Sequence, residues 1–139
     1  MTGESANTFV QCMVGRKLVL LERMELSWLF KFEDVATLTT ECPWRIITRV
    51  GISLASPDNG QSFGRQTAID AQAEAERLVL GKSIHRAIVR DDTGDLVLDF
   101  GDGLLLEALN TSAGFEAWHL NRPQGRTLIC GSGGKLQVV

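Results

Sequence analysis

The sequence predicts an α+β domain that is mainly antiparallel β, with two related β meanders and one packed α-helix between them. Three observations predict it: runs of alternating apolar and polar residues, turn-forming clusters between the runs, and a single stretch with helical periodicity. The 139 residues fit one domain. We expect a flexible N-terminus over 1–8 and a single domain over 9–139, which contains a first β unit (9–55), a helix (66–81) and a second β unit (82–139).

An aromatic alternation marks the first β unit. Trp28, Phe30 and Phe32 fall on one face of a strand, because alternate residues of a strand share a side of the sheet. The run 36–40 suits the strand that pairs with it across an acidic turn. A β-branched run over 45–52 predicts one further strand.

The helix follows the longest predicted loop, which is a cluster of turn formers over 56–65. Residues 68–80 contain neither proline nor glycine, and Gly81 stands where a helix C-cap belongs. Thr67 to Asp70 resembles a capping box in which Asp replaces Glu. One face of this helix would carry Ala68, Ala71, Ala75, Leu78 and Val79.

Strands return in the second β unit. Residues 84–90 and 96–100 flank a turn, and the Gly-Asp-Gly sequence at 101–103 predicts a tight hairpin back into 104–108. Shorter candidate strands cover 115–120, 127–130 and 136–139.

An internal similarity links the two units. The pattern Trp28-x-Phe30-x-Phe32-x-Asp34-x3-Leu38 returns with the same spacing as Leu96-x-Leu98-x-Phe100-x-Asp102-x3-Leu106. We interpret the chain as two related β units; the alternative is that hairpins of similar length look alike.

Composition argues against two classes of partner. A net charge of -3 provides no basic surface for nucleic acid or for an anionic membrane. The N-terminal apolar runs are too short for a signal peptide or a membrane span, so we expect a cytoplasmic protein. The widely spaced Cys12, Cys42 and Cys130 predict free, buried thiols rather than disulfides or a zinc site.

The sequence does not match the motifs that are typical of catalytic or metal-binding sites. Gly51–Ala55 resembles a nucleophile elbow only in part, and no helical pattern follows Ser53. Gly131–Lys135 lacks the helix that a phosphate-binding loop requires. His85 and His119 lack a convincing second metal ligand nearby in the sequence. We therefore predict no enzyme activity, no cofactor and no metal site.

Charge segregation points to a partner. Residues 91–121 contain no Lys or Arg, and their acids are Asp91, Asp92, Asp95, Asp99, Asp102, Glu107 and Glu116. An acidic face would attract a basic partner; alternatively, the charges only protect a sheet edge from strand addition. The predicted partner-binding residues are Asp91, Asp92, Asp95, Asp99 and Asp102.

The C-terminal half carries a family resemblance in Phe115-Glu116-Ala117-Trp118, then Cys130, then Gly133-Gly134-Lys135-Leu136. This order resembles a bacterial family of small domains of unknown function, and Cys42-Pro43-Trp44-Arg45 resembles that family's first hairpin. The resemblance covers most of 14–139. It implies a small cytoplasmic protein without catalytic residues and, by analogy in size and acidity, one similar to immunity proteins of bacterial toxin systems.

Two residues of this pattern have structural interpretations. Trp118 should fill the core, and Glu116, two positions earlier, should face the same side of the strand.

We therefore expect a non-enzymatic protein-binding domain, most concretely an immunity protein that occludes a basic toxin domain through its acidic face. One alternative is a structural or oligomerising module, such as a homodimer. Another is a small-ligand binder or enzyme whose pocket would be lined by Trp44, Arg45, Glu116 and His119.

Overall fold

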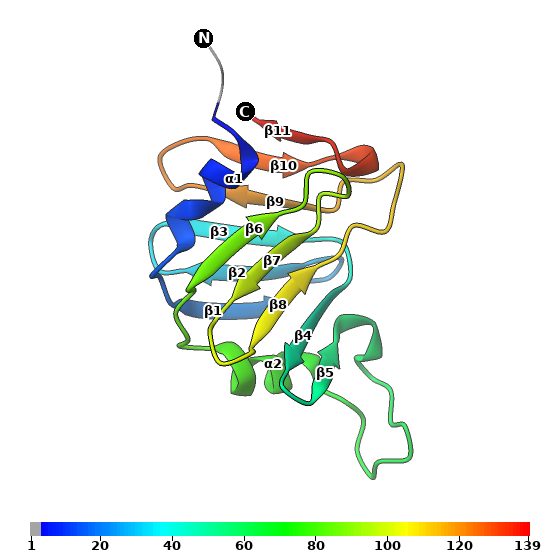
Figure 1. Cartoon of the computed structure of the whole chain (residues 1–139). Helices are drawn as coiled ribbons and strands as arrows, with labels where there is room; N and C mark the ends of the chain where they lie inside the picture. The colour runs from blue at the N-terminus through cyan, green and yellow to red at the C-terminus, as the bar shows by residue number, and fades with distance from the viewer. Residues whose placement is uncertain (1–3) are drawn as a thin grey trace.

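The computed structural model describes residues 4–139, so residues 1–3 of the predicted flexible N-terminus lie outside the described part. Two antiparallel sheets stack against each other, and in Figure 1 strands β6 to β8 cross in front of β1 to β3. The strands are β1 (Leu18–Arg23), β2 (Trp28–Phe32), β3 (Ala36–Thr40), β4 (Trp44–Thr48), β5 (Gly51–Ala55), β6 (Arg86–Val89), β7 (Leu96–Asp99), β8 (Leu105–Ala108), β9 (Trp118–Asn121), β10 (Thr127–Cys130) and β11 (Leu136–Val138). The helices are α1 (Ala6–Phe9), α2 (Ala71–Val79) and three 3₁₀ turns, η1 (Val10–Met13), η2 (Ser56–Asp58) and η3 (Ser132–Gly134).

The two β units interlock rather than lie side by side. One sheet has the order β1-β2-β3-β9-β10-β11 and the other has the order β5-β4-β8-β7-β6. Each unit therefore forms a three-strand meander in one sheet and then crosses to extend the sheet of the other unit.

Strand register agrees with the internal similarity of the sequence. Trp118, the first residue of β9, lies opposite Thr40, the last residue of β3. Trp44, the first residue of β4, lies opposite Ala108, the last residue of β8. Reciprocal pairing of this kind is what a twofold relation between two units produces.

The same reciprocity appears where the meanders begin. The Gly15 N–H donates to the Ile84 carbonyl, and the Gly81 N–H donates to the Leu18 carbonyl, each with an N···O distance of 2.7 Å. Both glycines have a positive φ, which favours a residue without a side chain.

The predicted aromatic alternation does form the core. The six large apolar residues of the two matching patterns are all buried: Trp28, Phe30, Phe32, Leu96, Leu98 and Phe100. The Trp28 and Trp44 rings pack edge to face, with 4.9 Å between ring centroids. Trp118 is completely buried, as predicted. The two helices close the sides of the stack, because α2 contacts β1 and β5 while α1 contacts β6 and β11.

The helix prediction needs two corrections. First, α2 spans only Ala71–Val79, because Asp70 is its N-cap and its side chain accepts a hydrogen bond from the Ala73 N–H. Second, the described residues contain a further α-helix, α1, which begins inside the segment 1–8 that was predicted to be flexible. Its Asn7 amide exchanges two hydrogen bonds of 2.9 Å with the Val89 backbone, which anchors the N-terminal segment to the edge of β6.

One predicted strand is a hairpin. The run 45–52 divides into β4 and β5, which pair with each other. The chain reverses at Arg49 and Val50, and Gly51, the first residue of β5, has a φ of 116°, a conformation that only glycine adopts easily. The described residues contain no helix that is long and apolar enough to cross a membrane.

Candidate functional site

The two crossovers between the sheets lie side by side. The Glu41 N–H donates to the Ala117 carbonyl and the Leu109 N–H donates to the Pro43 carbonyl, both with an N···O distance of 2.8 Å. These two bonds occupy equivalent places in the two units. They bring together segments that are far apart in the sequence.

The crossovers differ in length. Three residues, 41–43, connect β3 to β4, whereas nine residues, 109–117, connect β8 to β9. Three residues suffice for the crossing, so the remaining residues of the second crossover are not required by the fold. Loops that exceed structural need are frequent carriers of function.

The long crossover is held in place by local hydrogen bonds. Asp95 Oδ1 accepts from the Asn110 N–H at 2.8 Å, and Asn110 Nδ2 donates to the Thr93 carbonyl at 2.9 Å. Further along, Ser112 Oγ accepts from the N–H groups of Gly114 and Phe115 at 3.0 and 2.9 Å. The loop is therefore exposed but tethered.

A cavity of about 260 Å³ opens beside this loop, and we call it the crossover groove. Cys42 and Ala117 are buried at its floor. Leu26, from the β1–β2 turn, and Phe115, from the long crossover, are 87% and 78% exposed. The complete lining is Leu26, Glu41, Cys42, Pro43, Asn110, Thr111, Ser112, Phe115, Glu116 and Ala117.

The charge of the crossover groove is negative. Glu41 and Glu116 are both exposed, and the lining contains no Lys or Arg within the described chain. Glu116 Oε1 lies 3.1 Å from Nδ1 of His119. Burial raises the pKa of the Cys42 thiol to about 12, so this sulfur stays protonated and is a poor nucleophile at neutral pH.

A second cavity, of about 370 Å³, lies against the same loop, and we call it the side groove. It shares Asn110, Thr111 and Ser112 with the crossover groove. Its remaining lining residues are Asp92, Thr93, Ala113 and Gly133. Arg90 Nη2 donates a hydrogen bond to Asp92 Oδ2 at 3.0 Å, and this bond lowers the pKa of the Asp92 carboxyl.

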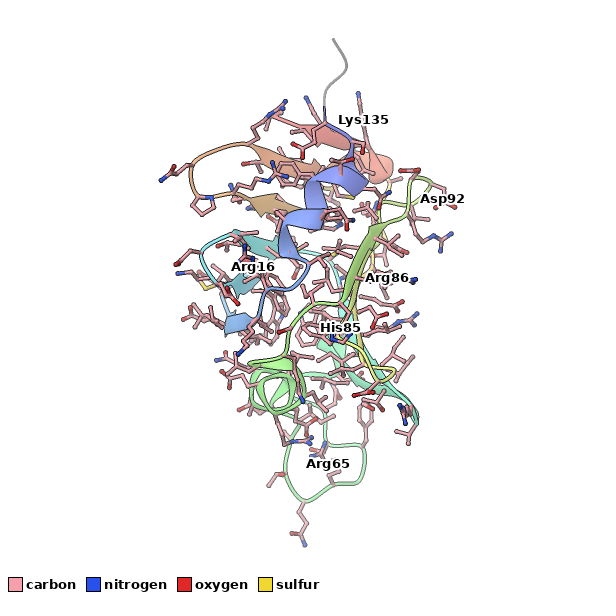
Figure 2. All side chains as sticks on the ribbon, turned by 60° about the vertical axis from the view of Figure 1, so that its left-hand side comes forward. Arg16, Arg65, His85, Arg86, Asp92 and Lys135 are labelled. Carbon is pink, nitrogen blue, oxygen red and sulfur yellow. The ribbon has the colours of Figure 1, made fainter. Side chains whose placement is uncertain are left out.

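The five predicted partner-binding acids do not form one patch. Asp91 and Asp92 are exposed in the β6–β7 turn, and Asp95 holds Asn110 at the start of β7. Asp99 and Asp102 lie at the other end of β7. There, Asp99 Oδ1 accepts a hydrogen bond from the Gly101 N–H, and Asp102 Oδ1 is 3.7 Å from Nη2 of Arg49. The backbone N–H of His85 donates to the Asp99 carbonyl, so His85 marks the end of β7 at which Asp99 lies. Figure 2 shows Asp92 and His85 well apart.

The predicted ligand-contact set is also dispersed. Trp44 is 1% exposed in the core, and Arg45, on the outer face of its sheet, is bonded to Glu107 at 2.7 Å. His119 lies on the outer face of the other sheet, between buried Trp118 and Leu120. Among the four side chains, the hydrogen-bonded contact that the structure gives is between Glu116 and His119.

The predicted orientation of Glu116 is wrong. Trp118 is buried, and its indole N–H donates to the Gly94 carbonyl at 2.8 Å, whereas Glu116 is exposed. Strand β9 begins only at Trp118, so the two-residue period does not extend back to Glu116.

Sequence reasoning missed Leu26, Glu41 and Phe115 as site residues. No local pattern relates them, because they meet only through the paired crossovers. One signal was present: the second unit has more residues than the first between equivalent strands.

Comparison with known proteins gives one finding. A family model described as a family of unknown function (DUF6188) matches residues 11–139. No curated protein and no solved structure matches the chain. Within 4–139 there is no group of three or more His, Cys, Asp or Glu side chains that could hold a metal ion.

Proposed function

The chain belongs to the family of unknown function DUF6188, and from this premise we propose that it is a non-enzymatic protein-binding domain whose crossover groove receives its partner. The family assigns no activity, so the proposal depends on the groove.

One observation carries the proposal. Leu26 and Phe115 are large apolar side chains that remain mostly exposed, and both stand at the same cavity although they belong to different units. Exposed apolar groups that gather beside a depression are typical of protein contact sites, because a partner removes them from water. The tethering of the long crossover adds support, since a preorganised loop loses less entropy on binding.

The chemistry of the groove walls favours binding over catalysis. Cys42 is held in its protonated form, and Ser112 Oγ already accepts two backbone hydrogen bonds. His119 is near Glu116, and no hydrogen bond links it to a serine or cysteine within the described residues. A nucleophile with an adjacent base is what covalent catalysis would require.

The narrower form of the proposal is an immunity protein that neutralises a bacterial toxin in the cytoplasm. The family resemblance in the sequence and the carboxylates around the two grooves support it. In this form, Asp91 and Asp92 attract the basic partner from a distance, while the crossover groove provides the contact.

Site-specific photocrosslinking tests the proposal. A photoreactive phenylalanine analogue replaces Phe115 in one variant and Phe63 in the control variant. Phe63 is 69% exposed and lies on the loop before α2. Both variants are co-expressed with the product of the neighbouring reading frame. We expect an adduct at position 115 and none at position 63. Equal labelling, or labelling only at position 63, would exclude the crossover groove as the binding site.

A second candidate, an oligomerising module, is favoured by the outer face of the five-stranded sheet. Register places Ile88 beside Val97, and it places Ile47 between Leu105 on one neighbouring strand and Ile52 on the other. The charged residues of this face, Arg45, Arg86, Asp99 and Glu107, balance, so a second copy would meet no net repulsion. Sedimentation at several concentrations tests it: a strict monomer excludes this role.

A further inference from the structure

We infer that the crossover groove recognises an arginine that lies next to an apolar residue in an exposed segment of the partner protein. This inference rests on the proposed function and specifies the chemistry of the partner. Three observations carry it.

The first observation is unmatched negative charge. Elsewhere the chain supplies an arginine to several of its own carboxylates; the pairs are Glu4–Arg122, Glu33–Arg16, Glu74–Arg65, Asp92–Arg90, Asp102–Arg49 and Glu107–Arg45. Within the described residues, no Lys or Arg side-chain nitrogen forms an ion pair within 4.0 Å of a carboxylate oxygen of Glu41 or Glu116, and the contact that Glu116 does make is with the His119 ring, at 3.1 Å. A partner cation would complete in the groove the kind of pair that the fold makes elsewhere.

The second observation is the combination of apolar and acidic groups. Cys42, Pro43 and Ala117 give the floor an apolar surface, and Glu41 and Glu116 stand at its walls. An arginine side chain has the same division, because its methylene stem packs on apolar surface while its guanidinium seeks carboxylates. The exposed Leu26 then remains available to the neighbouring apolar residue.

The third observation is an internal precedent. The guanidinium of Arg122 lies 3.8 Å from the centre of the Phe9 ring, and the same group donates two hydrogen bonds to Glu4, at 2.9 and 3.1 Å. Phe115 and Glu116 offer a partner the same two elements, an aromatic ring and a carboxylate, on adjacent residues. Arginine is better suited than lysine to such a site, because its planar head can stack and donate in a fork at once.

The experiment uses the full chain and three matched pentapeptides. The probe is acetyl-Leu-Arg-Leu-Arg-Leu-amide; citrulline replaces arginine in the second peptide, which keeps its shape and removes its charge, and lysine replaces it in the third. Binding is followed by the backbone amide resonances of Thr111, Phe115 and Ala117. We expect affinity to fall about tenfold or more from arginine to citrulline, with lysine between them.

Protein variants locate the effect. Glu41→Gln and Glu116→Gln should each weaken the arginine peptide, while Glu22→Gln, an equal change of net charge on β1, should leave it unchanged. If the citrulline peptide binds as tightly as the arginine peptide, or if both groove variants bind like the unchanged protein, the inference is overturned.

The outcomes also separate the inference from the proposed function. If Phe115→Ser abolishes capture of the natural partner while the two glutamine variants retain it, the groove binds a protein but not through arginine. If Phe115→Ser and Leu26→Ser both leave capture of that partner intact, the proposed function itself fails.

Discussion

Asp95 and Asn110 join the start of β7 to the base of the long crossover, because Asp95 Oδ1 accepts the Asn110 backbone N–H at 2.8 Å. Asn110 lines both grooves, so this bond positions the site from outside it. The half-buried Asp95, one of the five predicted partner-binding residues, thus supports the loop.

Replacing Asp95 should loosen the long crossover. Asp95→Ala leaves the Asn110 N–H without its acceptor and should cost about 1–2 kcal/mol of unfolding free energy, with faster amide exchange over 110–116. Asp95→Asn keeps an oxygen at the same place and serves as the matched control. Unchanged exchange in the alanine variant would show that the loop does not depend on this bond.

The two equivalent tryptophans should respond differently to the same change. The Trp118 indole N–H donates to the Gly94 carbonyl, whereas the Trp44 Nε1 is buried without a hydrogen-bond partner. Trp118→Phe should therefore destabilise the protein more than Trp44→Phe, by about 1 kcal/mol, because both remove the same volume but only one removes a bond. Urea denaturation measures the difference, and equal midpoints would contradict the assignment.

The contact between Glu4 and Arg122 should make stability depend on pH. The hydrogen bond from Arg122 lowers the pKa of the Glu4 carboxyl from its ordinary value of 4.5. Since the folded pKa is depressed, the contribution is present above the unfolded value and disappears as the pH falls through the folded one. The Tm of the unchanged protein should exceed that of Glu4→Gln near pH 7, and the gap should close near pH 3. A gap that persists in acid would mean that this pair does not carry the effect.

The three cysteines should differ in reactivity. Burial raises the pKa of Cys42 to about 12 and that of Cys130 to about 11, while Cys12 is only partly buried. Iodoacetamide at pH 8 should label Cys12 first, and all three thiols should react in urea. Mass spectrometry of the digested protein identifies the sites. Labelling of Cys42 in the folded state at the rate of Cys12 would show that the groove floor opens.

Local periodicity was enough to predict the core, because an apolar residue at every second position must face inward in a stacked sheet. Trp28, Phe30, Leu96 and Leu98 are all buried for this reason. The hairpin of β4 and β5 was missed, since its β-branched run continues through the turn at Arg49 and Val50 and gives no break in composition.

The site was harder to predict for a physical reason. Leu26 and Phe115 are separated by most of the chain, and they become neighbours only because the crossovers at 41–43 and 109–117 exchange backbone hydrogen bonds. Acidic residues were visible in the sequence, but whether each supports a turn, pairs with an arginine or faces a cavity depends on that long-range geometry. The predicted acidic face consequently divides between the two ends of β7.

The exchange of strands between the two β units also governs how the molecule can come apart. Each sheet contains strands from both halves of the chain, so neither half encloses an apolar interior alone. Melting should occur in one transition. A single proteolytic cut in the exposed loop before α2 should leave two fragments that stay associated until the whole structure unfolds.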